Sequence, residues 1–204
     1  MAYTEALAGV RGRSVVEEEI ERNPARAADP DAASRMVAAV EEARERGDSV
    51  GGIVACRIRG VPAGLGEPVF DKLDADLAKA MLSIGAVKAI EFGKGFGFAE
   101  MTGSEANDPM SNDPMSKEGF LSNNTGGILG GISTGQEIFF RIAVKPPSSI
   151  SLPQKTVDIE GREREVRTEG RHDPCICPRA VPVVEAMAAI VLEDHFKRQA
   201  ALHA

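Results

Sequence analysis

Apolar residues recur every three or four positions in three stretches of the chain, and this spacing predicts three helices. The first covers about residues 31–46 and ends at Gly47. The second covers about 68–84 and the third about 179–199. Their apolar faces are expected to consist of Met36, Val37, Val40 and Ala43; of Val69, Leu73, Leu77, Ala80, Met81 and Ile84; and of Val181, Val184, Met187, Ala188, Val191 and Leu192.

Shorter apolar or alternating runs predict strands between these helices. Residues 50–60 form one strand, and residues 86–92 form another, with 95–101 as its expected partner. Residues 126–144 are expected to form two strands joined at Gly135, and 154–168 a charged hairpin. Residues 1–16 carry little pattern. The mixture of strands and long helices predicts an α+β fold in a single domain.

A polar segment over residues 102–124 contains the tandem repeat NDPMS. Because such a segment has little apolar area to bury, we expect it to be a mobile loop.

Composition and charge narrow the functional classes. The chain has 204 residues and a formal charge of −7, which argues against general nucleic-acid binding but leaves room for a local basic pocket. It has neither an apolar run long enough to span a membrane nor a signal-peptide pattern. Its three cysteines favour a reduced, cytoplasmic protein.

Two glycine-containing stretches allow a structural and a functional interpretation. Residues 64–71 (GLGEPVFD) suit the start of a helix, and we interpret them as structural. Residues 123–133 (NNTGGILGGIS) place four glycines within a strand pattern, which indicates either the close approach of a ligand or a bulged, tightly packed strand. The spacing does not match a dinucleotide-binding fingerprint.

Two further stretches carry polar groups. Residues 145–150 (KPPSSI) could bind phosphate through a lysine and two hydroxyls, although a strand-ending turn explains them as well. In residues 170–175 (GRHDPC), Arg171 could clamp an anion, and His172 or Asp173 could transfer protons. Four zinc ligands are not in sight around Cys175 and Cys177, so no metal site is predicted. His195 and His203 are expected at the solvated surface.

Four of these stretches together resemble the chorismate synthase family in order and spacing. They are residues 60–88, 122–136 (SNNTGGILGGISTGQ), 145–150 and 170–187 (GRHDPCICPRAVPVVEAM). The resemblance covers roughly residues 47–196, and residues 21–26 would extend it upstream. It implies a β-α-β sandwich, a homotetramer and the anti-1,4-elimination of phosphate from 5-enolpyruvylshikimate 3-phosphate to give chorismate. It also implies reduced FMN as the cofactor, without net redox change.

The resemblance also assigns roles to individual positions. Flavin contacts fall on Gly85, Ala86, Gly130, Lys145, Pro146, Pro147, Ser148, Ser149 and Arg171. Many relatives have Asn at position 85 and a hydroxyl or small residue at position 147, so these two contacts depart from the family pattern. Arg171 is also expected to touch the substrate, and Asp173 is the expected proton-transfer residue.

The family's N-terminal part, with its Gly-Glu-Ser-His-Gly stretch, has no counterpart in this sequence. We therefore expect a sandwich truncated at its N-terminus, with little or no lyase activity in this chain alone. A non-catalytic flavin-binding module and an oligomerisation fragment are the alternatives. Some family members reduce flavin with NAD(P)H, and this sequence does not separate the two types.

Overall fold

The computed structural model describes residues 1–112 and 119–202. The chain divides into two compact units. Unit 1 comprises Met1–Ala2, Ala55–Ile142 and Pro182–Ala204, and unit 2 comprises Tyr3–Val54 and Ala143–Val181. Helices and strands are mixed, and none of the described helices is long and apolar enough to cross a bilayer.

Two strands form at residues where the sequence showed little pattern and for which no element was predicted. β1 (Ala2–Leu7) pairs antiparallel with β2 (Val10–Arg11), and the turn between them places Ala8 and Gly9 at positive φ. Five of the six β1 residues are buried. Burial on both faces removes the alternation of polar and apolar residues that normally identifies a strand. A short 3₁₀ helix, η1 (Glu17–Arg22), follows.

The predicted first helix is confirmed as α1 (Pro30–Glu45) in unit 2. It begins where Asp29 accepts a hydrogen bond from Ala32 N and where proline occupies the first turn. Its buried residues include Met36 and Ala43.

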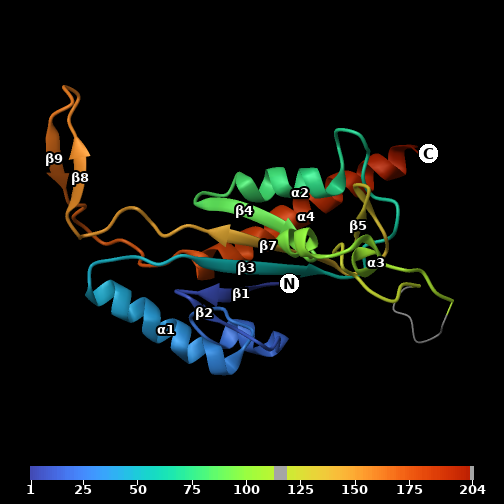
Figure 1. Ribbon diagram of the computed structural model, residues 1–204, viewed down its shortest axis with the longest axis horizontal. Coiled ribbons are helices and arrows are strands. Elements are labelled where there is room, and N and C mark those ends of the chain that lie inside the picture. Colours follow the sequence, from blue (N-terminus) through green and yellow to red (C-terminus); the bar gives the residue numbers. More distant parts are fainter. Residues whose placement is uncertain (113–118, 203–204) are drawn as a thin grey trace. The chain divides into compact units, whose positions relative to one another are not determined.

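The predicted charged hairpin is also confirmed, as β8 (Gln154–Val157) paired with β9 (Glu163–Val166), and it stands apart from α1 (Figure 1).

Unit 1 is built on β4 (Val87–Phe92), α2 (Leu73–Leu82) and the greater part of two strands shared with unit 2. These shared strands are β3 (Gly52–Ile58) and β7 (Ile138–Val144), and the sheet has the order β2-β1-β3-β7-β4. In β7, Ile138, Phe140 and Ile142 are buried and alternate with half-buried residues. This alternation is typical of a strand with one face on the core.

Three sequence predictions in unit 1 were wrong in detail. The second helix begins at Leu73 rather than Pro68, because Glu67 and Asp71 exchange backbone hydrogen bonds of 2.8 and 3.0 Å and form a bridged turn instead. The segment expected to pair with β4 is a 3₁₀ helix, η2 (Gly95–Glu100), and β7 is the partner of β4. Positive φ values at Gly93 and Gly95 turn the chain away from the sheet.

The third prediction concerned the segment before β7. Two further short strands, β5 (Ile128–Leu129) and β6 (Ile132–Ser133), precede β7, so residues 126–144 form three strands rather than two. Gly135 does lie in the connection between β6 and β7.

The polar segment at 102–124 contains one turn of helix, α3 (Gly103–Ala106), followed by an anchored carboxylate. Asp108 accepts hydrogen bonds from Ser122 Oγ at 2.6 Å, Asn124 N at 2.6 Å and Thr125 Oγ1 at 2.8 Å. Residues 113–118, which include much of the second NDPMS repeat, lie outside the described residues, and the predicted mobility stays a prediction.

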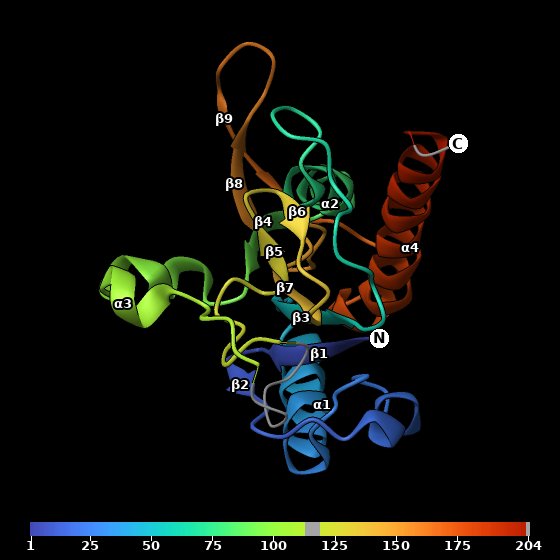
Figure 2. The ribbon, with the colours of Figure 1, turned by 90° about the vertical axis from the view of Figure 1, so that its right-hand side faces the viewer.

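The long C-terminal helix is confirmed as α4 (Cys177–Leu202), although Met187 and Val191 are only half-buried. Its second half runs beside α2 (Figures 1 and 2). The surface position predicted for His195 is wrong: the residue is 2% exposed, and its Nε2 lies 3.0 Å from Asp76 Oδ2 on α2. The helical period places His195 on the buried face, three residues after Leu192. His203 lies outside the described residues.

Candidate active site

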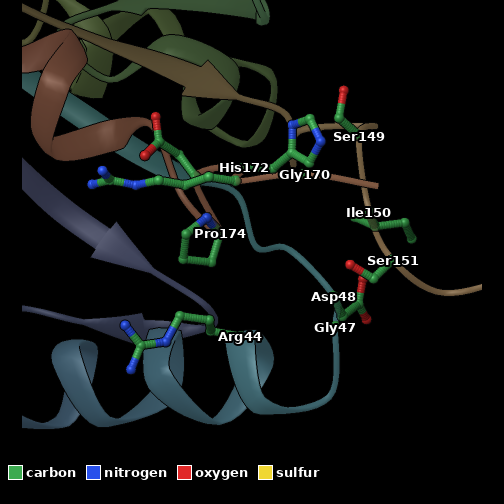
Figure 3. Close-up of a pocket in the computed structure, with 11 residues that line it drawn as sticks. Arg44, Gly47, Asp48, Ser149, Ile150, Ser151, Gly170, His172 and Pro174 are labelled. Carbon is green, nitrogen blue, oxygen red and sulfur yellow. The ribbon is translucent and has the colours of Figure 1, made fainter. Parts of the chain in front are cut away.

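Three segments of unit 2 surround a pocket of about 180 Å³ (Figure 3). They are the end of α1 with the turn after it, the loop after β7, and the loop before α4. Figure 3 shows side chains from all three segments around the pocket. The lining residues are Arg44, Gly47, Asp48, Ser149, Ile150, Ser151, Gly170, Arg171, His172, Asp173 and Pro174.

The loop after β7 leaves the sheet because of its prolines. β7 ends at Val144, and Lys145 is followed by Pro146 and Pro147, which have no N–H to donate to a neighbouring strand. Lys145, Ser148 and Ser149 are exposed. The loop therefore presents an ammonium group and two hydroxyls that are not used by the sheet.

The turn after α1 ends that helix with a glycine in the left-handed region. Gly47 has φ +72°, its N–H donates to Arg44 O at 3.0 Å, and Asp48 N donates to Ala43 O at 2.9 Å. These two bonds form a Schellman cap, which satisfies carbonyls that the helix would leave unpaired. The cap places Asp48 at the edge of the pocket.

The loop before α4 contains three consecutive charged or titratable residues, Arg171, His172 and Asp173. Asp173 Oδ2 lies 2.6 Å from Arg179 Nη1 in the first turns of α4, and the Asp173 side chain is 35% exposed. His172 Nε2 lies 3.4 Å from Glu169 O. Because Arg179 holds Asp173 from the helix side, the orientation of the carboxylate is fixed by the element that follows the loop.

The pocket is lined by two arginines and two aspartates. Arg44 and Arg171 line it together with Asp48 and Asp173. Across residues 1–112 and 119–202, neither Arg44 nor Arg171 forms an ion pair. An unpaired guanidinium can bind a carboxylate or phosphate through two parallel hydrogen bonds, so the pocket is suited to an anionic ligand.

The structure brings some of the predicted site residues together. Ser149, Arg171 and Asp173 line this one pocket, although 21 residues of chain lie between the first two. Lys145, Pro146, Pro147 and Ser148 lie on the same loop as Ser149, just before it.

The other predicted residues, Gly85, Ala86 and Gly130, belong to unit 1. A Cβ placed on Gly85 or Gly130 would have no atom within 4 Å, so both backbones have an open face. Ala86 has φ +69°, a value that non-glycine residues rarely adopt. Such strained backbone is frequent at ligand-binding sites. The unit 1 positions are therefore accessible to a ligand.

The glycine run at 123–133 is tightly packed at one end, and the ligand approach that the sequence also allowed stays a prediction. Cβ atoms on Gly126 and Gly127 would come within 2.6 Å of backbone oxygens, so these glycines are needed for close packing. Gly130 and Gly131 form the two-residue turn between β5 and β6, and of these two only Gly130 has open space beside it.

Sequence reasoning missed Arg44, Asp48 and Ser151 as lining residues and treated Gly47 only as the end of a helix. The sequence did contain one signal for this turn: a glycine that ends a helix is followed by two polar residues and then by a strand. This signal does not show which distant loops will pack on the turn. In the described part of the chain, no group of three or more His, Cys, Asp or Glu side chains could hold a metal ion.

A family model described as chorismate synthase matches residues 1–196. The chain is 56% identical to a chorismate synthase of Roseiflexus castenholzii, with 98% of this chain and 56% of that protein covered. It is 55% identical to one of Methanothermobacter thermautotrophicus, with 90% of this chain and 49% of that protein covered. The chain thus spans about half the length of the relatives it matches.

A solved structure described as chorismate synthase has a similar fold. Its TM-score to this chain is 0.74 at 26% identity, with 97% of this chain and 56% of the solved chain covered. The similarity confirms the predicted α+β class.

Proposed function

Because this chain belongs to the chorismate synthase family, we propose that it takes part in the anti-1,4-elimination of phosphate from 5-enolpyruvylshikimate 3-phosphate to give chorismate. The main support for the proposal is that Ser149, Arg171 and Asp173 line one polar pocket. Ser149 belongs to the KPPSSI sequence, and the other two residues belong to the GRHDPC sequence. Reduced FMN is the proposed cofactor.

Each unit, taken by itself, presents groups that suit one part of a flavin nucleotide. Gly85 and Gly130 have open backbone faces, which a flat ring system could approach closely. Lys145, Ser148 and Ser149 offer an exposed ammonium group and hydroxyls, which suit phosphate and carbonyl oxygens. When bound, the reduced flavin would supply the electron that assists the departure of phosphate.

Arg171 and Asp173 have separate proposed roles. The substrate carries a phosphate and carboxylates, and the unpaired Arg171 guanidinium could bind one of these anions and orient the ring. The recorded contact of Arg179 is with Oδ2 of Asp173, so Oδ1 is the oxygen that we propose to accept or give the proton. We assign Asp173 to proton transfer, either with the flavin or with the substrate.

Self-association and a cytoplasmic location belong to the same proposal. In unit 1, Val69 and Phe70 are 75% and 92% exposed, and large apolar side chains at such exposure are typical of an interface. The free Cys56, Cys175 and Cys177 suit a reducing compartment. The mass of the chain in solution, measured by light scattering, tests the assembly. A monomer at all concentrations would contradict it.

The binding experiment titrates FMN into the purified chain and follows flavin fluorescence, with and without 5-enolpyruvylshikimate 3-phosphate. We expect binding that tightens with substrate and that weakens at least tenfold in Arg171→Ala, because a charge-assisted contact is lost. Arg171→Lys keeps the charge but not the bidentate geometry, and should restore little. Arg22→Ala, whose ion pair with Glu19 is on the exposed face of η1, is the control.

The activity experiment uses a chimera in which the part of the Roseiflexus castenholzii relative outside the match precedes Met1. We expect chorismate from the chimera and little or none from the chain alone, because this chain spans about half of its relatives. Flavin binding without elimination in the chimera would favour the non-catalytic module. A chain that binds neither flavin nor substrate would contradict the proposal, and if it also self-associated it would favour the oligomerisation fragment.

A further inference from the structure

The turn between α1 and β3, residues 47–50, makes hydrogen bonds to both of the loops that carry the proposed site. It lies directly after the Schellman cap, so its backbone direction is fixed by the end of a 16-residue helix. All the contacts described below lie within unit 2. The turn is thus a rigid element next to two loops that have little regular structure.

Two hydrogen bonds join the turn to the loop after β7. Ser49 Oγ donates to Pro147 O at 2.5 Å, and Ser151 N donates to Gly47 O at 3.0 Å. Pro146 and Pro147 have no N–H groups, so this part of the loop cannot be held by donors of its own. The hydroxyl of Ser49 therefore supplies a bond at the proline pair, two residues before Ser149.

A third hydrogen bond joins the turn to the loop before α4. Val50 N donates to Pro174 O at 2.8 Å, next to Asp173. The adjoining Gly51 packs so closely that a Cβ there would lie 2.5 Å from Val144 O and 3.0 Å from Pro146 Cδ. Contacts to both loops thus originate within five consecutive residues.

We propose that Ser49 is a positioning residue: its hydrogen bond to Pro147 O holds the Lys145–Ser149 loop in place beside Arg171 and Asp173. The proposal rests on the proposed function, because it assigns the loop to flavin binding. Ser49 itself does not line the pocket and acts through the loop.

The first test measures amide hydrogen exchange in the chain without ligand. Ser49→Ala should speed exchange at the hydrogen-bonded amides of Ile150 and Ser151 by about tenfold, because the loop loses its side-chain anchor. Ser49→Thr keeps the hydroxyl and should restore protection. Thr102→Ala removes a hydroxyl that bonds Glu105 in unit 1, and it should leave residues 148–151 unchanged. Equal exchange in wild type and Ser49→Ala would overturn the proposal.

The second test measures the dissociation constant for FMN in the same variants. We expect an increase of about five- to tenfold in Ser49→Ala, recovery in Ser49→Thr and no change in Thr102→Ala. A lower melting temperature in Ser49→Ala with an unchanged dissociation constant would show a merely structural role and refute the proposal. If the wild-type chain binds no flavin, the proposed function fails, while the exchange test still decides whether Ser49 holds the loop.

Discussion

Replacement of Asp29 by alanine should destabilise the chain strongly, because one buried carboxylate holds two segments together. It accepts hydrogen bonds from Arg13 N at 2.7 Å, Ser14 N at 3.0 Å and Ala32 N at 2.9 Å, and the residue is 6% exposed. Asp29 caps α1 and also fixes the chain that follows β2. The alanine variant leaves all three donors without this acceptor.

The expected loss is about 3 kcal/mol at pH 7. Loss of a helix cap costs about 1 kcal/mol, and each of the two further hydrogen bonds contributes about 1 kcal/mol at the typical net value for a protein hydrogen bond. For a chain of this length, 3 kcal/mol corresponds to a decrease in Tm of about 10 °C.

The loss should also depend on pH. Backbone hydrogen bonds from Arg13, Ala32 and Ser14 hold the pKa of Asp29 well below its usual range. The stabilising contribution is therefore complete above the unfolded-state pKa of about 4 and is lost as the pH falls toward the lower folded-state value. The difference between wild type and Asp29→Ala should shrink below about pH 4.

Urea unfolding followed by far-ultraviolet circular dichroism at pH 7 and pH 3 measures both effects. Asp31→Ala is the matched control, because Asp31 is an exposed acidic residue in the first turn of the same helix. Its removal should cost less than about 1 kcal/mol, the value of a helix-dipole interaction. Equal losses in the two variants at pH 7 would refute the reasoning from the three hydrogen bonds.

Three further predictions concern other parts of the chain. Gly130→Ala should lower the free energy of unfolding by only about 1–2 kcal/mol but weaken FMN binding, whereas Gly127→Ala, whose Cβ would lie 2.6 Å from Glu137 O, should lower the free energy of unfolding by more. Urea unfolding measures the two stabilities and flavin titration measures the binding. A larger loss of stability in Gly130→Ala than in Gly127→Ala would contradict the prediction. His195→Ala should lower the free energy of unfolding by about 2–4 kcal/mol, because it opens a cavity and removes the partner of Asp76. Thermal unfolding measures the loss, and the loss should be smaller in His195→Gln. Iodoacetamide at pH 8 should modify Cys175 before Cys56, because a hydrogen bond with the Cys177 thiol lowers the pKa of Cys175 while burial raises the pKa of Cys56 to about 12. Mass spectrometry after digestion shows the order of labelling, and earlier labelling of Cys56 would contradict the prediction.

The amphipathic helices could be predicted from the sequence because one face of each is buried. α1 and α4 lie close to their predicted ranges, although Val37 and Val40 of α1 and Met187 and Val191 of α4 are only half-buried. β1 escaped prediction because it is buried on both faces and shows no alternation. The start of α2 was placed too early because Pro68 and Glu67 suit a helix N-terminus, whereas the hydrogen bonds between Glu67 and Asp71 can only be seen in three dimensions.

Prediction of the site had a similar limit. The sequence identified the loops of Ser149, Arg171 and Asp173 by their residue types, and the structure places these three residues around one pocket. Arg44 and Ser49 carried no distinguishing signal, since an arginine near the end of a helix and a serine after a glycine are common. Their roles follow from which loops pack on the turn, and this depends on tertiary contacts at a separation of about a hundred residues.

The volume of the pocket bears on how much of a binding site this chain provides. Pockets for small molecules usually measure about 300–1,000 Å³, whereas the pocket beside Arg171 measures about 180 Å³. That space can enclose a phosphate or carboxylate group but not a whole flavin nucleotide. Its charged walls supply orientation, while Ile150 and Pro174 contribute the apolar side chains of its lining and offer only a small area of the apolar surface that normally gives most of the affinity for a flat ring. The chain alone should therefore bind FMN weakly and with strong dependence on salt, because ionic contacts dominate. The chimera should bind it more tightly and with less dependence on salt, since additional lining would exclude water from the same contacts.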